Sequence, residues 1–268
     1  MKDTDKYKTP SFSERLPTKW LGKKILFFKE IPSTQDEIKK RASSEKSGLV
    51  VLADRQTQGR GRLARAWFSP RGAGLYFSIL LKGPLAQPIT LYSLATAVGV
   101  ARGLEQLLDI PVKLKWPNDI LIKQKKIGGI LLEKVPEGLV IGVGLNVTFK
   151  KENLPPDIRE KASSIFLETG IIFSRPQILR AVLVELEKIY EKLLEEGFNA
   201  VEDAWQKRDV TKGSKVVLKR GEEILKGQAI GPTPKGELLI ETNKGVITVS
   251  SGEILMWEIS GWHQPKAA

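Results

Sequence analysis

One polar stretch, residues 53–67, restricts the folding of this chain more than any other segment. It reads ADRQTQGRGRLARAW and carries four arginines and two glycines, with almost no large apolar residue before Trp67. A polar run of this length cannot bury itself, so we expect a surface loop. Apolar runs typical of buried strands flank it at 48–52 and 74–81. The segment therefore predicts a loop that connects two strands.

The centre of the loop, Gly59-Arg60-Gly61-Arg62, joins a free backbone to fixed positive charge. Glycine lets the main chain approach a ligand closely, and arginine offers a planar fork of donors for carboxylate or phosphate oxygens. We therefore expect the loop to fold over an anion. A solvated basic loop is the alternative on composition alone. The spacing Gly59-x-Gly61-x-x-Ala64 matches the dinucleotide-binding fingerprint of the Rossmann fold. That motif needs a strand directly before it and a helix directly after it, and the sequence offers neither, so we do not expect a Rossmann-type site.

The length of 268 residues and an apolar fraction of 41% predict a sizeable core in one large domain, or in one domain plus a small one. The chain has no cysteine and one histidine, His263, so disulfides are excluded and neither a histidine-rich metal site nor a serine–histidine triad is expected. No membrane-spanning run or signal peptide is evident, so we expect a cytoplasmic protein. The net charge of +12 calls for an anionic partner, which could be nucleic acid, a nucleotide or an acidic protein.

Periodicity predicts the order of elements up to residue 210. Ser33 or Thr34 is expected to cap a helix, and Gly142 and Gly144 should clear one face of their strand. The expected strands are 25–28, 48–52, 74–81, 112–119, 120–122, 127–133 and 139–147, and the expected helices cover 90–108, 178–196 and about 201–206.

The composition changes near residue 211, where short strands divided by glycine turns begin. They cover 216–219, 224–230, 237–241 and 245–249, a spacing typical of a small SH3-type β-barrel. We therefore expect an N-terminal extension (1–24), a main domain (25–210) and a C-terminal barrel domain (211–260).

Three motifs together resemble the biotin protein ligase family: DRQTQGRGRLARAWFSP, then KWPNDIL followed by KKIGGILLE, and GVGLNV. The loop departs from the family pattern at Leu63, usually arginine, and at Ala64, usually glycine. The resemblance implies an α+β fold in which a mixed β-sheet is flanked by helices, as in class II synthetases, followed by the SH3-like barrel. It also implies a member of the type without an N-terminal DNA-binding domain.

The resemblance implies the site residues as well. Gln35 stands where the family usually has asparagine. Biotin binding is implied for Ser33, Thr34, Gln35, Gln56, Gly59, Arg60, Gly61, Arg62, Lys126, Gly128 and Gly129. Nucleotide binding is implied for Arg62, Trp67, Lys115, Asn118, Lys126, Gly144 and Asn146. Catalytic roles are implied for Lys126, Arg60 and Asp119, with Mg²⁺ accompanying ATP and no protein metal site assigned.

The activity implied is ATP-dependent: biotin becomes biotinyl-5′-AMP and is then transferred to a lysine of the biotin carboxyl carrier protein of acetyl-CoA carboxylase. A homodimer is possible, and neither DNA nor a membrane is expected as a partner. Two alternatives stay open. One is a lipoate–protein ligase on the same fold, and the other is a nucleic-acid-binding regulator that uses the basic loop.

Overall fold

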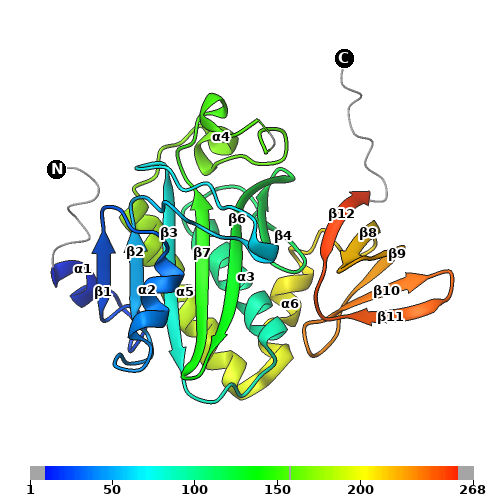
Figure 1. Cartoon of the computed structure of the whole chain (residues 1–268), viewed down its shortest axis with the longest axis horizontal. Coiled ribbons are helices and arrows are strands. Elements are labelled where there is room, and N and C mark those ends of the chain that lie inside the picture. The colour runs from blue at the N-terminus through cyan, green and yellow to red at the C-terminus, as the bar shows by residue number, and fades with distance from the viewer. Residues whose placement is uncertain (1–9, 157, 259–268) are drawn as a thin grey trace.

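The computed structural model describes residues 10–156 and 158–258, so His263 lies outside the described residues. Figure 1 shows a large sheet with helices on both faces and a smaller sheet at one side. The helices are α1 (Pro10–Glu14), α2 (Thr34–Arg41), α3 (Ile89–Glu105), α4 (Ile165–Thr169), α5 (Arg175–Glu196) and α6 (Glu202–Gln206), with single 3₁₀ turns η2 (Arg62–Ala64), η3 (Lys151–Asn153) and η4 (Gly197–Ala200).

The large sheet has seven strands in the order β1-β2-β3-β7-β6-β5-β4. Only β1 and β2 run parallel, so the sheet is mixed, as expected. Its strands are β1 (Ile25–Phe28), β2 (Val50–Ala53), β3 (Gly74–Lys82), β4 (Lys113–Lys115), β5 (Asp119–Ile122), β6 (Lys125–Val135) and β7 (Gly138–Asn146).

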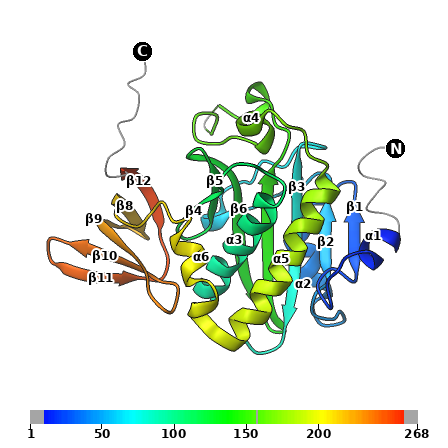
Figure 2. The ribbon, with the colours of Figure 1, turned by 180° about the vertical axis from the view of Figure 1, so that it is seen from behind.

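The two faces of this sheet are covered differently. Helices α3 and α5 lie side by side over one face and bury the main core against it (Figure 2). Short α2 covers only part of the other face, where Ile38 packs on Leu49, Val51 and Leu80. Ser33 is the N-cap of α2, because its Oγ accepts a hydrogen bond from the Asp36 N–H at 3.4 Å. We call this side of the sheet the α2 face. The part of it that α2 leaves uncovered lies beneath the polar loop.

The predicted single strand 112–119 is wrong, because the chain reverses within it. β4 ends at Lys115 and β5 starts at Asp119, and the two strands pair antiparallel with Lys115 opposite Asp119. The turn between them contains Pro117, which has no N–H to donate to a sheet. This reversal brings two charged residues of the KWPND motif together.

The predicted small β domain at the C-terminus is confirmed, and within residues 211–258 its five antiparallel strands form an open sheet and not a closed barrel. Its strands follow the order β11-β10-β9-β8-β12, and in residues 211–258 no pairing joins the edge strands β11 and β12. The fifth strand, β12, was not predicted. The strands are β8 (Lys215–Arg220), β9 (Glu223–Pro232), β10 (Leu238–Thr242), β11 (Gly245–Val249) and β12 (Glu253–Glu258).

The small sheet is anchored on the large one through Trp116. Its Nε1 donates to the carbonyl of Gly236 at 3.1 Å, and its backbone N–H donates to Oγ1 of Thr211 at 2.9 Å.

Before β1, Leu16 and Leu21 are buried in the main core. The proposed domain boundaries stay a prediction.

Candidate active site

Three glycines leave bare backbone on the α2 face of the large sheet. A Cβ atom on Gly144 would lie 2.4 Å from Nε1 of Trp67, and one on Gly142 would lie 3.1 Å from Cδ of Gln35. Gly129 on β6 faces the same indole at 3.1 Å from Cζ3. The prediction that Gly142 and Gly144 clear one face is therefore confirmed. We call these three residues the glycine floor.

A cleft of about 1850 Å³ lies over the glycine floor, between the polar loop, the start of α2, the β5–β6 hairpin and β12. It gathers residues that are far apart in the sequence. The predicted site residues that line it are Ser33, Thr34, Gln35, Gln56, Arg60, Gly61, Arg62, Trp67, Lys115, Asn118, Asp119, Lys126, Gly129, Gly144 and Asn146.

Gly59 and Gly128 are not among the residues that line the cleft. A Cβ on Gly128 would meet Cδ2 of Leu145 at 2.6 Å, on the face that packs toward α3. A Cβ on Gly59 would meet the Trp67 carbonyl oxygen at 2.7 Å. Close packing of the protein against itself explains both glycines, and the geometry does not place them at a ligand surface.

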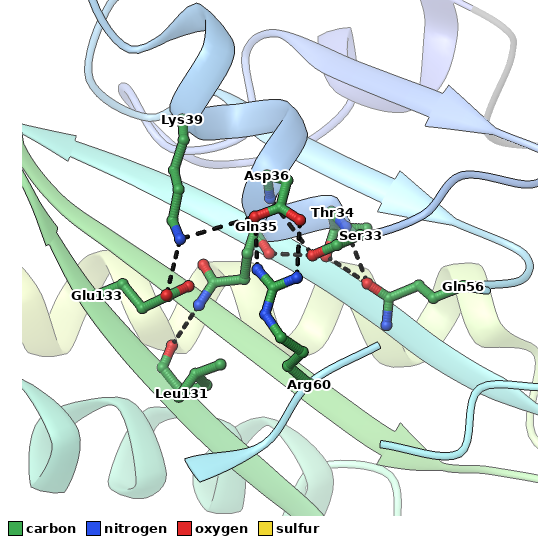
Figure 3. Close-up of polar contacts among 10 residues, drawn as sticks. Ser33, Thr34, Gln35, Asp36, Lys39, Gln56, Arg60, Leu131 and Glu133 are labelled. Atoms are coloured by element: carbon green, nitrogen blue, oxygen red, sulfur yellow. Dashed lines mark hydrogen bonds and ion pairs between the residues drawn. The ribbon is translucent and has the colours of Figure 1, made fainter. Parts of the chain in front are cut away.

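One end of the cleft is lined by neutral polar groups at the start of α2. Gln56 Oε1 accepts hydrogen bonds from the backbone N–H and the Oγ1 hydroxyl of Thr34, at 2.9 and 3.1 Å. Gln35 Nε2 donates to the Leu131 carbonyl at 3.1 Å (Figure 3). The Gln35 Oε1 atom is buried and has no hydrogen-bond partner within the described part of the chain. A buried acceptor without a donor is costly, so this end is suited to a ligand that brings an N–H group.

The other end is cationic. Lys126 Nζ lies 2.5 Å from Asp119 Oδ1 and 5.5 Å from the centroid of the Trp67 ring. Lys115 Nζ lies 3.9 Å from Asp119 Oδ2. Burial lowers the pKa of Lys115, an effect that the Asp119 carboxylate opposes and the Lys126 ammonium reinforces. Two ammonium groups thus share one carboxylate, which leaves a surplus positive charge facing the cleft.

The two asparagines for which nucleotide binding was predicted, Asn118 and Asn146, hydrogen-bond to backbone in the cleft walls. Asn118 Nδ2 donates to the Ile130 carbonyl, and Asn146 Nδ2 donates to the Ser163 carbonyl, each at 2.8 Å. Both side chains are thereby oriented by the sheet and by the segment before α4.

The second half of the polar loop reaches the C-terminal domain. Arg62 Nη1 donates to the Gly252 carbonyl at 3.0 Å, and Arg65 forms an ion pair with Glu253. Burial lowers the pKa of Arg62. Leu63 and Ala64 adopt left-handed φ angles of 54° and 57°, and at position 64 the family usually has glycine. These contacts to Gly252 and to Glu253, the first residue of β12, were not predicted, because no local pattern indicates them.

The first half of the loop is held by α2. Arg60 forms a two-point ion pair with Asp36, a residue that sequence analysis missed (Figure 3). The Arg60 hydrogen bonds lower the pKa of Asp36. The only available signal was an acidic residue directly after Ser33-Thr34-Gln35.

The stem of the loop is fixed by a buried ion pair. Asp54 Oδ1 lies 2.6 Å from Arg175 Nη1, and both side chains are 8% exposed. The same Asp54 oxygen accepts the Gly72 N–H at 3.1 Å, and Arg175 donates to the Gly74 carbonyl at 3.3 Å. The N-terminus of α5 therefore holds both ends of the loop together.

Comparison with known proteins agrees with this geometry. Residues 27–149 match the model of the Biotin/lipoate A/B protein ligase family, and residues 211–257 match the biotin protein ligase C-terminal domain. The bifunctional ligase/repressor BirA of Bacillus subtilis is 31% identical over 89% of this chain and 76% of its own length. The chain belongs to the biotin protein ligase family.

Two further relatives resemble nearly the whole chain. The biotin–[acetyl-CoA-carboxylase] ligase of Mycobacterium tuberculosis is 29% identical over 95% of this chain and 99% of its own. The biotin protein ligase of Aquifex aeolicus, solved in complex with biotin and ATP, is 34% identical, with a TM-score of 0.79 over 89% of this chain and 100% of that one. The predicted membership of the biotin protein ligase family is confirmed.

No helix among the described residues has the length and apolar character needed to cross a membrane.

Proposed function

We propose that this protein is an ATP-dependent biotin–protein ligase. The observation that carries the proposal is the arrangement of the cleft on one sheet face. The amide groups of Gln35 and Gln56 lie at one end, the Lys126–Asp119–Lys115 cluster lies at the other, and the glycine floor joins them. A neutral hydrogen-bonding ring with a carboxylate tail fits the first end and points its carboxylate toward the second.

The proposed reaction has two half-reactions. A carboxylate oxygen of biotin attacks the α-phosphorus of ATP, which forms biotinyl-5′-AMP and releases pyrophosphate. The amine of a carrier lysine then attacks the acyl carbon, loses a proton and releases AMP. Two anions meet in the first step, so the surplus positive charge at Lys126 and Lys115 stabilises the transition state electrostatically. The polar loop would keep water away from the mixed anhydride.

Mg²⁺ is expected to arrive with ATP. The described residues include no group of three or more acidic or histidine side chains able to hold a metal ion. Mg²⁺ commonly keeps several waters and binds through substrate phosphates plus one or two carboxylates. Asp119, which lines the cleft, fits the role of that single protein carboxylate. The ion would offset phosphate charge during adenylate formation.

The acceptor we propose is the biotin carboxyl carrier protein of acetyl-CoA carboxylase, by similarity to the Mycobacterium tuberculosis enzyme. A homodimer and a cytoplasmic location stay predictions. We do not expect DNA binding through the polar loop, because Arg60, Arg62 and Arg65 contact Asp36, Gly252 and Glu253.

The acid that is activated tests this proposal. Biotin should drive exchange of labelled pyrophosphate into ATP, whereas lipoate at the same concentration should not. Exchange driven by lipoate alone would favour the lipoate–protein ligase, and exchange with neither acid would contradict both activities.

The glycine floor predicts which substrate each end binds. Gly144→Ala should displace Trp67 and raise the KM for ATP more than that for biotin. Gly142→Ala should crowd Gln35 and raise the KM for biotin more. Overpacking typically costs about 1–3 kcal/mol, so we expect increases of about five- to 150-fold in these KM values. Steady-state kinetics with each substrate varied in turn measures the pattern. Equal changes in both KM values in both variants would contradict the assignment of the two ends.

The C-terminal domain should act by holding the loop. Trypsin should cleave at Arg62 or Arg65 in the free protein, and biotin plus ATP should protect both sites. Glu253→Gln should speed cleavage of the free protein about two- to fivefold, because an exposed ion pair contributes up to about 1 kcal/mol. Glu241→Gln, an exposed change on β10 of the same sheet, is the control. Equal cleavage of Glu253→Gln and wild type would show that the contact to β12 does not restrain the loop.

A further inference from the structure

Arg60 directs both ends of its guanidinium group to one carboxylate. Its Nη1 donates to Asp36 Oδ2 at 2.8 Å and its Nη2 donates to Asp36 Oδ1 at 2.5 Å (Figure 3). This parallel two-point arrangement is among the most specific that arginine forms. The side chains of Arg60 and Asp36 are 33% and 34% exposed, so they are partly shielded from solvent. The Asp36 carboxylate therefore balances the positive charge of Arg60 within the protein.

The pair belongs to a chain of alternating charges that joins three elements. Lys39 Nζ lies 3.7 Å from Asp36 Oδ1 and 2.7 Å from Glu133 Oε1. The chain runs from the loop through α2 to β6 and contains two cations and two carboxylates. Its net charge is zero, unlike that of the Lys126 cluster. Of the two cations assigned to catalysis by family resemblance, only Lys126 thus lies in a cluster with surplus positive charge.

The position of Asp36 in the sequence links the Asp36–Arg60 ion pair to the proposed ligand-binding residues. Asp36 directly follows Thr34 and Gln35, which form the amide end of the cleft in the same turn of α2. A rigid helical turn therefore carries the proposed ring-binding groups and the anchor of the loop together. Less than one turn of helix separates these two features.

We propose that Asp36 and Arg60 are a positioning pair that closes the first half of the loop over the biotin end of the cleft, and that Arg60 is not the cation that stabilises the reacting phosphoryl group. This inference rests on the proposed function. It assigns a role to Asp36, and it places Arg60 in substrate retention.

A double-mutant cycle tests the proposal, using Asp36→Asn, Arg60→Gln and the double variant. Each single change should raise the KM for biotin about fivefold, as expected for loss of a partly exposed ion pair, and should leave the rate at saturating biotin and ATP within about twofold of wild type. The double variant should be no worse than the poorer single variant. The proposal would be overturned if the KM increases of the two single variants multiplied in the double variant. A large fall in the saturating rate of the Arg60→Gln single variant would overturn it as well.

Arg60→Lys separates the two roles without relying on changes in α2. It keeps the charge but loses the planar fork. A positioning role predicts a raised KM for biotin, as in Arg60→Gln, whereas an unchanged KM for biotin in Arg60→Lys would contradict it. Because position 60 lies in the loop, the Arg60 variants keep the test decisive if Asp36→Asn does not fold.

Glu37→Gln is the matched control for Asp36→Asn. Glu37 is the other acidic residue in the first turn of α2, and it pairs with Arg41 of the same helix. Its replacement should leave the KM for biotin within about twofold, since it removes a similar helix-dipole interaction without touching the loop. A KM change in Glu37→Gln equal to that in Asp36→Asn would assign the effect to the helix and overturn the pair. Absence of biotin-dependent pyrophosphate exchange in the wild type would refute the proposed function.

Discussion

Lys126→Ala should slow formation of biotinyl-5′-AMP by about 10²–10³ at saturating biotin and ATP. This is the usual loss when one donor aimed at developing charge is removed from an active site. The change leaves Asp119 in place and removes the ammonium that lies 2.5 Å from its Oδ1 atom. The cluster then loses its surplus positive charge at the place where two anions must meet. Rapid quenching of a single turnover, with the adenylate quantified directly, measures this step apart from transfer.

Lys125→Ala is the control for Lys126→Ala. Lys125 is the adjacent residue on β6, and its Nζ donates to the backbone carbonyl of Glu160. The Lys125→Ala change therefore removes one positive charge from the same hairpin and leaves the Lys126–Asp119 ion pair in place. We expect Lys125→Ala to form adenylate within about threefold of the wild-type rate, because an exposed charge contributes about 1 kcal/mol or less. A wild-type rate in Lys126→Ala would remove Lys126 from the catalytic assignment.

Asp54→Asn should lower the free energy of unfolding by about 3–5 kcal/mol. Removing one partner of a buried ion pair leaves the other charge poorly compensated, and this is the range such changes cost. Asp54 and Arg175 are each 8% exposed, and the Asp54 carboxylate also accepts the Gly72 N–H. The variant therefore loses stability and loosens the loop stem together. Denaturant unfolding followed by circular dichroism gives the stability, and loop cleavage by trypsin reports the stem.

Glu30→Gln separates burial from mere pairing. Glu30 pairs with Arg55 on the polar loop and with Arg71 just after it, but its side chain is 42% exposed. Exposed pairs contribute up to about 1 kcal/mol, so the control should unfold close to wild type. If Asp54→Asn and Glu30→Gln lost the same stability, the buried pair would not be the anchor of the loop.

Features that depend on neighbouring residues were predictable from the sequence alone. A capping serine and the helical spacing after it act within one turn, so Ser33 and α2 follow from local preference. The alternation of Gly142 and Gly144 follows from the two-residue period of a strand. The polar composition of 53–67 placed the loop at the surface for the same kind of reason. The family motifs then indicated which of these features belong to one site.

Only the tertiary structure decided how the loop is held and what it can reach. Asp36 and Arg60 are 24 residues apart, and Arg62 and Gly252 are 190 residues apart, so no local pattern relates them. Their pairing depends on where the strands and the second domain place each backbone. The open C-terminal sheet has the same origin, because strand spacing shows that strands exist and leaves undecided whether β11 and β12 meet. Local energies select the elements, whereas long-range contacts select the partners of their charged side chains.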